Sequence, residues 1–247
     1  MTAVISTRTR GIRGATYGFT LAIVSLVAMM AGASAPSPFY PVLAQRIGFD
    51  AVVTTIVFAV YAVALLATLV TAGSLSDHIG RRPVASAGLL LLAVSVVVFW
   101  NADATGLLVL ARLLQGVASG LLLSSVSAAI ADLEPASRPG SAAVWNAVAP
   151  MAGLAIGALV AGAVLDATKD ALVDVFAPLA VLYVVLAALV WFAPETAPRK
   201  PGALASLGFR LKVPASMRTL FLQSTPAIFA GWAAGGFFLS LGASIVH

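Results

Sequence analysis

The feature that most constrains this chain is a series of apolar stretches, each about 20 residues long, that recurs along its whole length. In hydrocarbon every backbone N–H and C=O group needs a partner within the protein, and only helices and closed barrels provide one. These stretches are continuously apolar and lack the alternation of barrel strands, so they predict helices. Because 61% of the residues are hydrophobic and only 9% are charged, a water-soluble surface cannot be built. The chain is therefore predicted to be an all-α membrane protein.

Apolar windows of membrane length predict about seven transmembrane helices, at 15–35, 52–74, 84–100, 107–131, 142–165, 175–194 and 218–242. Arg8, Arg10 and Arg13 precede the first window, as basic residues precede the core of a signal peptide. The run from Ala15 to Ala35 is too long for such a core, and further spans follow it. We interpret it as an uncleaved first helix.

Basic residues gather on one side of these spans. The connections on that side hold Arg81, Arg82, Arg138 and further Arg and Lys residues between 199 and 218, whereas the other side holds only Arg46 and Lys169. The positive-inside rule predicts a cytoplasmic N-terminus in a multi-pass protein of the cell membrane. The same rule accounts for the net charge of +5, so nucleic-acid binding is not expected.

A short charged connection follows the second predicted helix, where residues 73–82 read GSLSDHIGRR. Gly73 has no Cβ and allows a neighbouring helix to approach closely. Gly80 permits a tight turn. Arg81 and Arg82 are placed to lie at the lipid headgroups.

Asp77 lies in the same connection, at the expected end of the second helix. A negative charge is unfavourable there unless a positive group answers it, and Arg81, a backbone donor and the N-terminus of another helix are the candidates. The pattern resembles the G-x-L-x-D-R-x-G-R-R signature of the major facilitator superfamily, a family of secondary transporters, with His78 in place of the usual arginine. The resemblance implies that Asp77, with the glycines and arginines around it, forms a latch between two helical bundles.

Arg112 is the only charged residue predicted inside the hydrocarbon, in the fourth helix. A charged side chain at that depth is a functional hypothesis by default. With Gln115 and Gly116 it resembles the fourth-helix signature of the family, which implies a role in proton coupling or in recognition of substrate charge. An arginine that snorkels to the external interface is the alternative. No Asp or Glu lies within the predicted spans to pair with it.

Glycines recur in the fifth predicted helix at Gly153, Gly157 and Gly162. The first two, four residues apart, form a helix-packing pattern. The stretch resembles a weakened form of the antiporter signature G-x-x-x-G-P-x-x-G-G, with Ala158 and Ala161 as departures. The resemblance favours antiport, and ordinary close packing is the alternative.

Three further features of the sequence are weaker. Asp132 and Arg138, after the fourth helix, repeat the acid-then-arginine outline of residues 77–82, as two three-helix repeats would. Glu195, in a Pro-Glu-Thr sequence, resembles the family's sixth-helix ending. Tyr40 lies near a predicted interface and is interpreted as a belt anchor.

The resemblance implies a six-helix N-terminal bundle over 1–194, a basic cytoplasmic linker over 195–217 and, over 218–247, the first helix of an incomplete C-terminal bundle. It implies secondary active transport by alternating access, as proton-coupled export of a small solute or drug. The expected partners are the solute, protons, the lipid bilayer and the missing C-terminal bundle. Residues 1–247 alone are expected not to transport, because half of the cavity wall is absent.

Three alternatives remain. A proton-coupled uptake symporter for a sugar or organic acid would be favoured by a carboxylate in the first helix, which has none. A truncated membrane protein or partner-binding subunit would not transport. An enzyme is the weakest alternative, because the sequence has no cysteine, paired carboxylates, nucleophile triad, phosphate loop or metal-ligand cluster. Neither a cofactor nor a metal is expected.

Overall fold

The fold is built from helices. The computed structural model describes residues 2–203, 207–208, 218–219, 222–227, 229–231 and 233–234, with side chains from residue 14 onward. Along the chain the elements are α1 (Thr2–Ser34), η1 (Ser37–Phe39), α2 (Tyr40–Ile47), α3 (Ala51–Ala72), α4 (Ser76–Ile79), α5 (Arg81–Trp100), α6 (Thr105–Asp132), α7 (Ser141–Ala167), α8 (Ala171–Leu189) and η2 (Val190–Phe192).

Six stretches of helix within the described residues are long and apolar enough to cross a membrane. They coincide with the six spans predicted between residues 15 and 194, so that part of the prediction is confirmed. The predicted seventh span at 218–242 and the linker at 195–217 are described only in part, and the described residues between 218 and 234 are helical. Both stay predictions.

The first span is longer than predicted and is broken in the middle. α1 ends at Ser34, close to the predicted end of the span, but the chain turns through η1 and becomes helical again as α2. Proline is well tolerated at the first positions of a helix, where its missing N–H costs nothing. The span therefore runs from Gly14 to Ile47, beyond the predicted end at residue 35.

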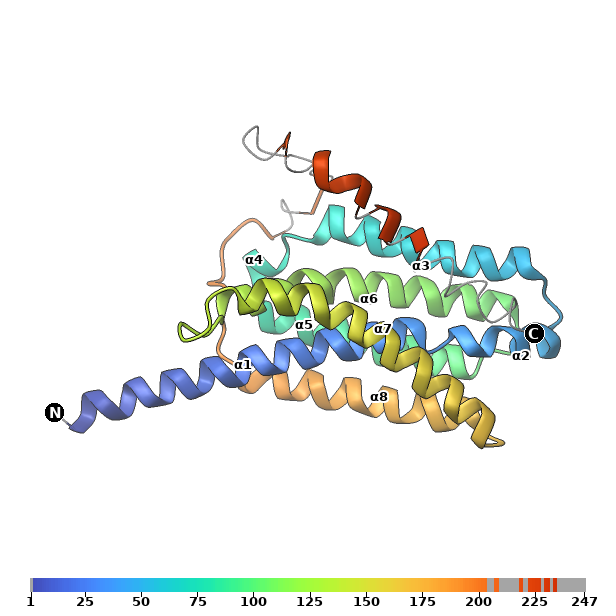
Figure 1. Cartoon of the computed structure of the whole chain (residues 1–247), viewed down its shortest axis with the longest axis horizontal. Coiled ribbons are helices and arrows are strands. Elements are labelled where there is room, and N and C mark those ends of the chain that lie inside the picture. Colours follow the sequence, from blue (N-terminus) through green and yellow to red (C-terminus); the bar gives the residue numbers. More distant parts are fainter. Residues whose placement is uncertain are drawn as a thin grey trace.

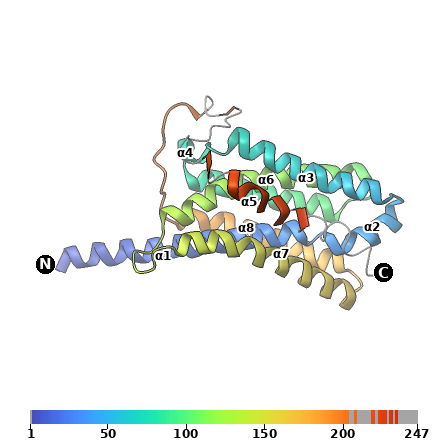
Figure 2. The ribbon, with the colours of Figure 1, turned by 45° about the horizontal axis from the view of Figure 1, so that its top comes forward.

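The long helices lie side by side in one bundle, with α6 near its centre (Figures 1 and 2). α6 packs against α3, α5 and α1. α5 also contacts α8, and α7 crosses α1 on the other side of the bundle. Helices distant in sequence thus meet around α1 and α6.

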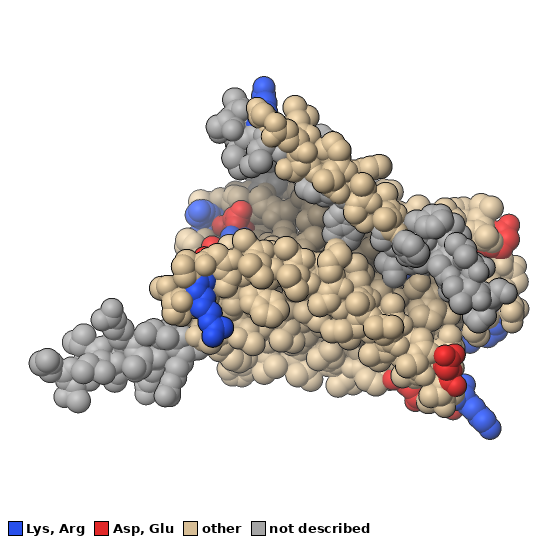
Figure 3. Space-filling view, in the orientation of Figure 1, with Lys and Arg blue, Asp and Glu red and all other residues tan. Residues whose placement is uncertain are grey.

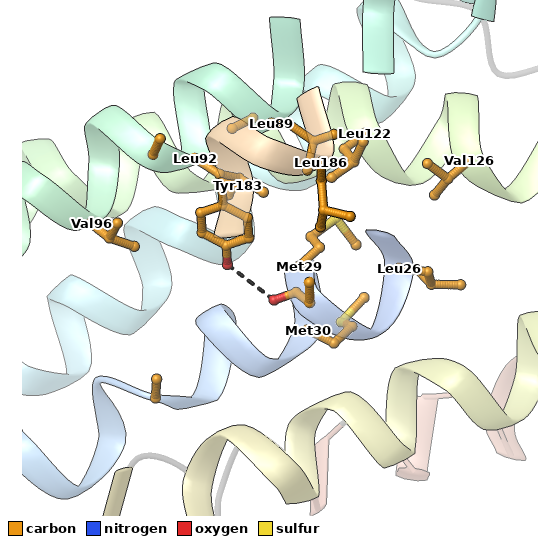
Figure 4. Packing of buried hydrophobic residues seen from close by; sticks show 14 of the residues in the cluster. Leu26, Met29, Met30, Leu89, Leu92, Val96, Leu122, Val126, Tyr183 and Leu186 are labelled. Atoms are coloured by element: carbon orange, nitrogen blue, oxygen red, sulfur yellow. Dashed lines mark hydrogen bonds between the residues drawn. The ribbon is translucent and has the colours of Figure 1, made fainter. Parts of the chain in front are cut away.

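The core lies where α1, α5, α6 and α8 converge (Figure 4). Leu26, Leu89 and Leu122 come from three of these helices and are fully buried. Tyr183 of α8 is also fully buried, and its hydroxyl donates a 3.0 Å hydrogen bond to the carbonyl of Ala28 in α1. Polar side chains that bond across helices in this way help hold membrane bundles together, where lipid is as apolar as the core.

Glycines bring two helix pairs into close contact. A Cβ on Gly153 or Gly157 of α7 would overlap backbone atoms of α1, whereas one on Gly162 would only touch Pro38 at 4.0 Å. The predicted packing pattern therefore holds for the first two glycines. A second pair, Gly116 and Gly120 of α6, meets α3 in the same way; its four-residue spacing is visible in the sequence, and we did not predict this contact.

Charged side chains lie toward the two ends of the bundle, with an uncharged surface between them (Figure 3). We call the end where α3, α6 and α8 finish and α5 and α7 begin the basic end, because it carries Arg81, Arg82 and Arg138. The opposite end carries Asp50 and Lys169 among others. The separation matches that expected for a membrane protein.

Candidate functional site

The loop of residues 73–80 lies at the basic end and makes two turns. α3 ends at Ala72, and Asp77 lies in the separate short helix α4, so the prediction that Asp77 ends the second helix is wrong. A turn over residues 73–75 divides the two helices. Gly80 has φ +108°, a conformation that other residues rarely adopt. It reverses the chain into α5, as predicted.

Arg81 connects two carboxylates at the start of α5. Its Nη1 lies 2.5 Å from Oδ1 of Asp77 and donates to Oγ of Ser76 at 2.7 Å. Its Nε lies 3.4 Å from Oδ2 of Asp132, the last residue of α6. Of the three partners left open for Asp77, Arg81 is the one present among the described residues. The side chain of Asp77 is 49% exposed, so this ion pair is accessible to water.

Glu195 lies after α8 and η2 in the chain, and its side chain caps the first turn of α5. Its carboxylate accepts hydrogen bonds from the backbone N–H groups of Arg81 at 2.8 Å and Arg82 at 3.1 Å. The first N–H groups of a helix have no partner within it, and a negative charge there is favourable. Thr196 donates to Oδ2 of Asp132 at 2.8 Å. The network therefore joins the end of α6, the chain after α8 and the start of α5.

A similar arrangement recurs where α7 begins. Gly140 precedes that helix with φ +87°, as Gly80 precedes α5. Oε1 of Glu134 accepts from the N–H of Ala142 at 2.9 Å. The same arrangement thus occurs twice. In each case a glycine with positive φ precedes a helix, and a carboxylate accepts a hydrogen bond from the first turn of that helix. In two three-helix repeats the start of α5 would correspond to the start of α8 and not of α7, so the predicted repeats stay a prediction.

His78 takes part through its backbone. Its carbonyl accepts from the N–H of Lys200 at 2.8 Å, which ties the chain after α8 to the loop. Its Nδ1–H donates to the carbonyl of Ser74 at 3.1 Å. The residue that departs from the family signature is therefore bound within the loop.

The second candidate site surrounds Arg112 of α6, which is 1% exposed. The snorkelling alternative is therefore wrong. Its Nε donates to the hydroxyl oxygen of Tyr40 at 2.7 Å, and its Nη1 donates to the carbonyl of Ala33 at 3.2 Å and to Oε1 of Gln115 at 2.6 Å. Gln115 in turn donates from Nε2 to the carbonyl of Gly32 at 2.8 Å.

Aromatic rings enclose the same guanidinium group. Its Cζ lies 5.1 Å from the ring centre of Phe58, 5.6 Å from those of Tyr40 and Tyr61, and 5.9 Å from that of Phe99. A cation is attracted to an aromatic face within about 6 Å. Tyr40 is 3% exposed, so its predicted role as a belt anchor is wrong. The reason is the proline break, which carries the residue inward.

The charge of Arg112 has no acidic counterpart among the described residues. Its Nη2 is buried without a hydrogen-bond partner there. Carbonyl oxygens, a phenol and four π faces neutralise the cation only partly. The buried site therefore keeps an unbalanced positive charge, whereas the ion pairs at the basic end are partly exposed.

Several members of these sites were only weak signals in the sequence. Asp132 and Glu195 appear there as parts of loose motifs, and their contact with Arg81 depends on how three helices converge. Tyr40, Phe58 and Phe99 carry no pattern that separates them from other membrane aromatics. The proline cluster before Tyr40 is the one signal that could have indicated its inward position.

Comparison with known proteins identifies the family of this chain. A family model described as "Major Facilitator Superfamily" matches residues 21–246. The chain is 33% identical over 150 residues to the uncharacterized MFS-type transporter Rv1250 of Mycobacterium tuberculosis, across 60% of this chain and 25% of that protein. It is 34% identical over 80 residues to the multidrug resistance protein MdtL of Shewanella oneidensis, across 32% of this chain and 20% of that protein.

The quinolone resistance protein NorA of Staphylococcus aureus is 26% identical over 101 residues, across 41% of this chain and 26% of that protein. The matched segments thus span about a quarter or less of the length of these relatives. The family model, in contrast, covers nearly all of the chain. The chain therefore belongs to the major facilitator superfamily, whose members are multi-pass membrane transporters.

Proposed function

We propose that this chain is the N-terminal part of a secondary active transporter that exports a small amphipathic solute in exchange for protons. The observation that carries the proposal is the network at the basic end, in which Arg81 connects Asp77 of the signature loop to Asp132. Such a network suits a conformational switch, because exposed ion pairs are each worth about 1 kcal/mol or less and exchange partners readily.

Export is supported by the names of the relatives. MdtL is named for multidrug resistance and NorA for quinolone resistance. Gly153 and Gly157, which hold α7 against α1, form the antiporter-like pattern noted in the sequence. Both observations favour removal of a solute from the cell over uptake.

The latch is proposed to work from the cytoplasmic side. The positive-inside rule assigns the basic end to the cytoplasm, with the N-terminus on the same side. In the outward-open state Asp77 would face the start of a helix in a second bundle, while Arg81 keeps it oriented. Opening inward would separate Asp77 from that helix, at the cost of its interaction with the helix dipole.

Alternating access requires two bundles with the solute between them. We propose residues 1–194 as the first bundle, 195–217 as the linker and 218–247 as the opening helix of a second bundle, which is the missing partner. Arg112 would supply positive charge near the middle of the membrane. Its counter-charge would come from the second bundle or from the solute, because the described spans offer none.

Transport can be tested in the natural host. A strain that lacks the gene is expected to accumulate ethidium, an amphipathic cation, faster than the parent strain, and the natural gene on a plasmid is expected to restore efflux. A protonophore should abolish that efflux. Equal accumulation in both strains would refute export of this class of solute, and efflux that survives the protonophore would refute proton coupling. A plasmid that encodes only residues 1–247 is expected not to restore efflux.

A further inference from the structure

The break in the first span leaves the backbone carbonyl of Gly32 without its ordinary helical partner. In an α-helix the N–H of each residue bonds the carbonyl four residues earlier, so the carbonyl of Gly32 would take its hydrogen from residue 36. That residue is Pro36, which has no N–H. Its backbone angles, φ −66° and ψ −20°, are nevertheless helical. The donor is missing although the backbone remains nearly helical.

A side chain from another helix supplies the missing donor. Nε2 of Gln115 in α6 donates to the carbonyl of Gly32 at 2.8 Å. Gln115 is 3% exposed, so water does not compete for this bond. An unpaired carbonyl in hydrocarbon is unfavourable, because no water is present to replace the missing donor. The bond is therefore worth more here than the same bond at a protein surface.

Gln115 is itself held by Arg112, and together they contact both sides of the break. Oε1 of Gln115 accepts from Nη1 of Arg112 at 2.6 Å. Arg112 bonds the carbonyl of Ala33, in the last turn of α1, and the hydroxyl of Tyr40, the first residue of α2. The two side chains thus connect the end of α1 to the start of α2 across η1.

We propose that Gln115 is a positioning residue whose amide N–H stands in for the N–H that Pro36 lacks, and that Gln115 and Arg112 together hold α1 and α2 at a fixed angle. This role differs from the direct coupling or substrate contact that the family resemblance implies for Gln115. It goes beyond the proposed export function and does not depend on it. It makes one specific prediction, namely that Gln115 is needed because residue 36 is proline.

The test uses the 247-residue chain in detergent micelles and measures the geometry of the break directly. The chain has no cysteine, so spin labels can be attached to Val24→Cys in α1 and Val42→Cys in α2, which are 42% and 45% exposed. Double electron–electron resonance then reports the distance between the two spin labels. We expect one narrow distance distribution for the otherwise unchanged chain.

Gln115→Glu is the decisive variant. Its carboxylate, beside the guanidinium of Arg112, is ionised, so it keeps the contact with Arg112 but cannot donate to Gly32. We expect a broadened label distance and a lower unfolding temperature. Adding Pro36→Ala restores a backbone N–H at residue 36 and is expected to return both measurements to those of the unchanged chain. Pro36→Ala alone should leave the distance as it was, because Pro38 and η1 keep the break.

Pro178→Ala is the matched control, because Pro178 lies inside α8 and its replacement returns no N–H to the carbonyl of Gly32. It should not rescue Gln115→Glu. Two results would overturn the proposal: an unchanged label distance in Gln115→Glu, or a broadened distance that Pro36→Ala fails to narrow. The measurement involves no transport, so failure of the export proposal would leave its outcome unaffected. Gln115→Leu, which loses both bonds, should be rescued only in part by Pro36→Ala.

Discussion

At the scale of single residues, the one buried arginine among the described side chains bonds to several neutral partners. Arg112 binds a phenol, a carbonyl and an amide, and four rings surround its Cζ. A planar guanidinium can donate in several directions at once, whereas an ammonium is a compact point charge. The geometry of the site therefore depends on arginine and not merely on positive charge.

Arg112→Lys is expected to destabilise the bundle although it keeps the charge. A lysine cannot reach Tyr40, Ala33 and Gln115 together, and a buried acceptor left unpaired costs about 1–3 kcal/mol. Thermal unfolding in detergent would measure the loss. Arg138→Lys, at the exposed turn before α7, serves as the control and should unfold with the unchanged chain. Equal unfolding temperatures for both variants would contradict the assigned role of Arg112.

Tyr40→Phe isolates a single bond within that site. The ring remains against Arg112, but the hydroxyl that accepts from Nε is lost, which should cost about 1 kcal/mol. Tyr17→Phe removes a comparable hydroxyl contact, to the carbonyl of Leu189 at 3.1 Å, from an exposed position. We expect a clearly smaller drop in unfolding temperature for Tyr17→Phe, and a drop as large as that of Tyr40→Phe would argue against a special role for Tyr40.

At the scale of elements, α7 lies against α1 because two glycines allow it. A Cβ on Gly157 would overlap the carbonyl oxygen of Ala31 and Oγ of Ser34, whereas one on Gly162 would meet only Pro38 at 4.0 Å. Gly-to-Ala changes otherwise favour a helix by about 1 kcal/mol. In a change to alanine at Gly157, the clash with α1 opposes the gain in helix propensity. At Gly162 there is no clash, so only the gain in helix propensity applies.

Gly157→Ala is expected to destabilise the bundle, and Gly162→Ala to leave it unchanged or slightly more stable. The first forces α1 and α7 apart, and the second improves the helix without a clash. Urea or heat unfolding followed by circular dichroism would rank the two variants. A stabilising Gly157→Ala would mean that α1 and α7 are not in close contact there.

The start of α5 depends on Glu195 in a similar way. Glu195→Ala removes the acceptor for two backbone N–H groups, and the loss of a cap typically costs about 1 kcal/mol. Hydrogen exchange at residues 81–84 should accelerate in this variant and change less in Glu195→Gln, which keeps an acceptor oxygen. Unchanged exchange in Glu195→Ala would show that another group covers this helix end.

The sequence predicted the helices better than it predicted the contacts between them. Continuous apolar runs locate each membrane span, because the membrane forces the backbone into a helix there. The helix α2 after Pro36 was not predicted. Prolines often mark the end of a helix, but they also suit its first positions. Glu195 lies 114 residues from Arg81, and a contact at that separation follows from packing that no local pattern encodes. Tyr40 was misjudged because the helix that continues after the proline break carries it inward.

At the scale of the whole molecule, the bundle divides its polar chemistry between two places. The network around Arg81 lies at the basic end and is partly exposed, and the site around Arg112 is buried near the break in the first span. α6 contributes to both, with Asp132 at its last residue and Arg112 within its length. Movement of α6 relative to both α1 and α5 would therefore alter both sites together.

The central claim is that Asp77 acts as a latch during export, and ethidium efflux from the host strain carrying the Asp77→Asn gene tests it most directly. A latch worth about 1.4 kcal/mol favours the latched state about tenfold, and we expect its loss to lower the efflux rate by a similar factor. Asp103→Asn, a change of the same kind at the opposite end of the bundle, should keep the full rate. Full efflux by Asp77→Asn, at an unchanged amount of protein in the membrane, would contradict the account.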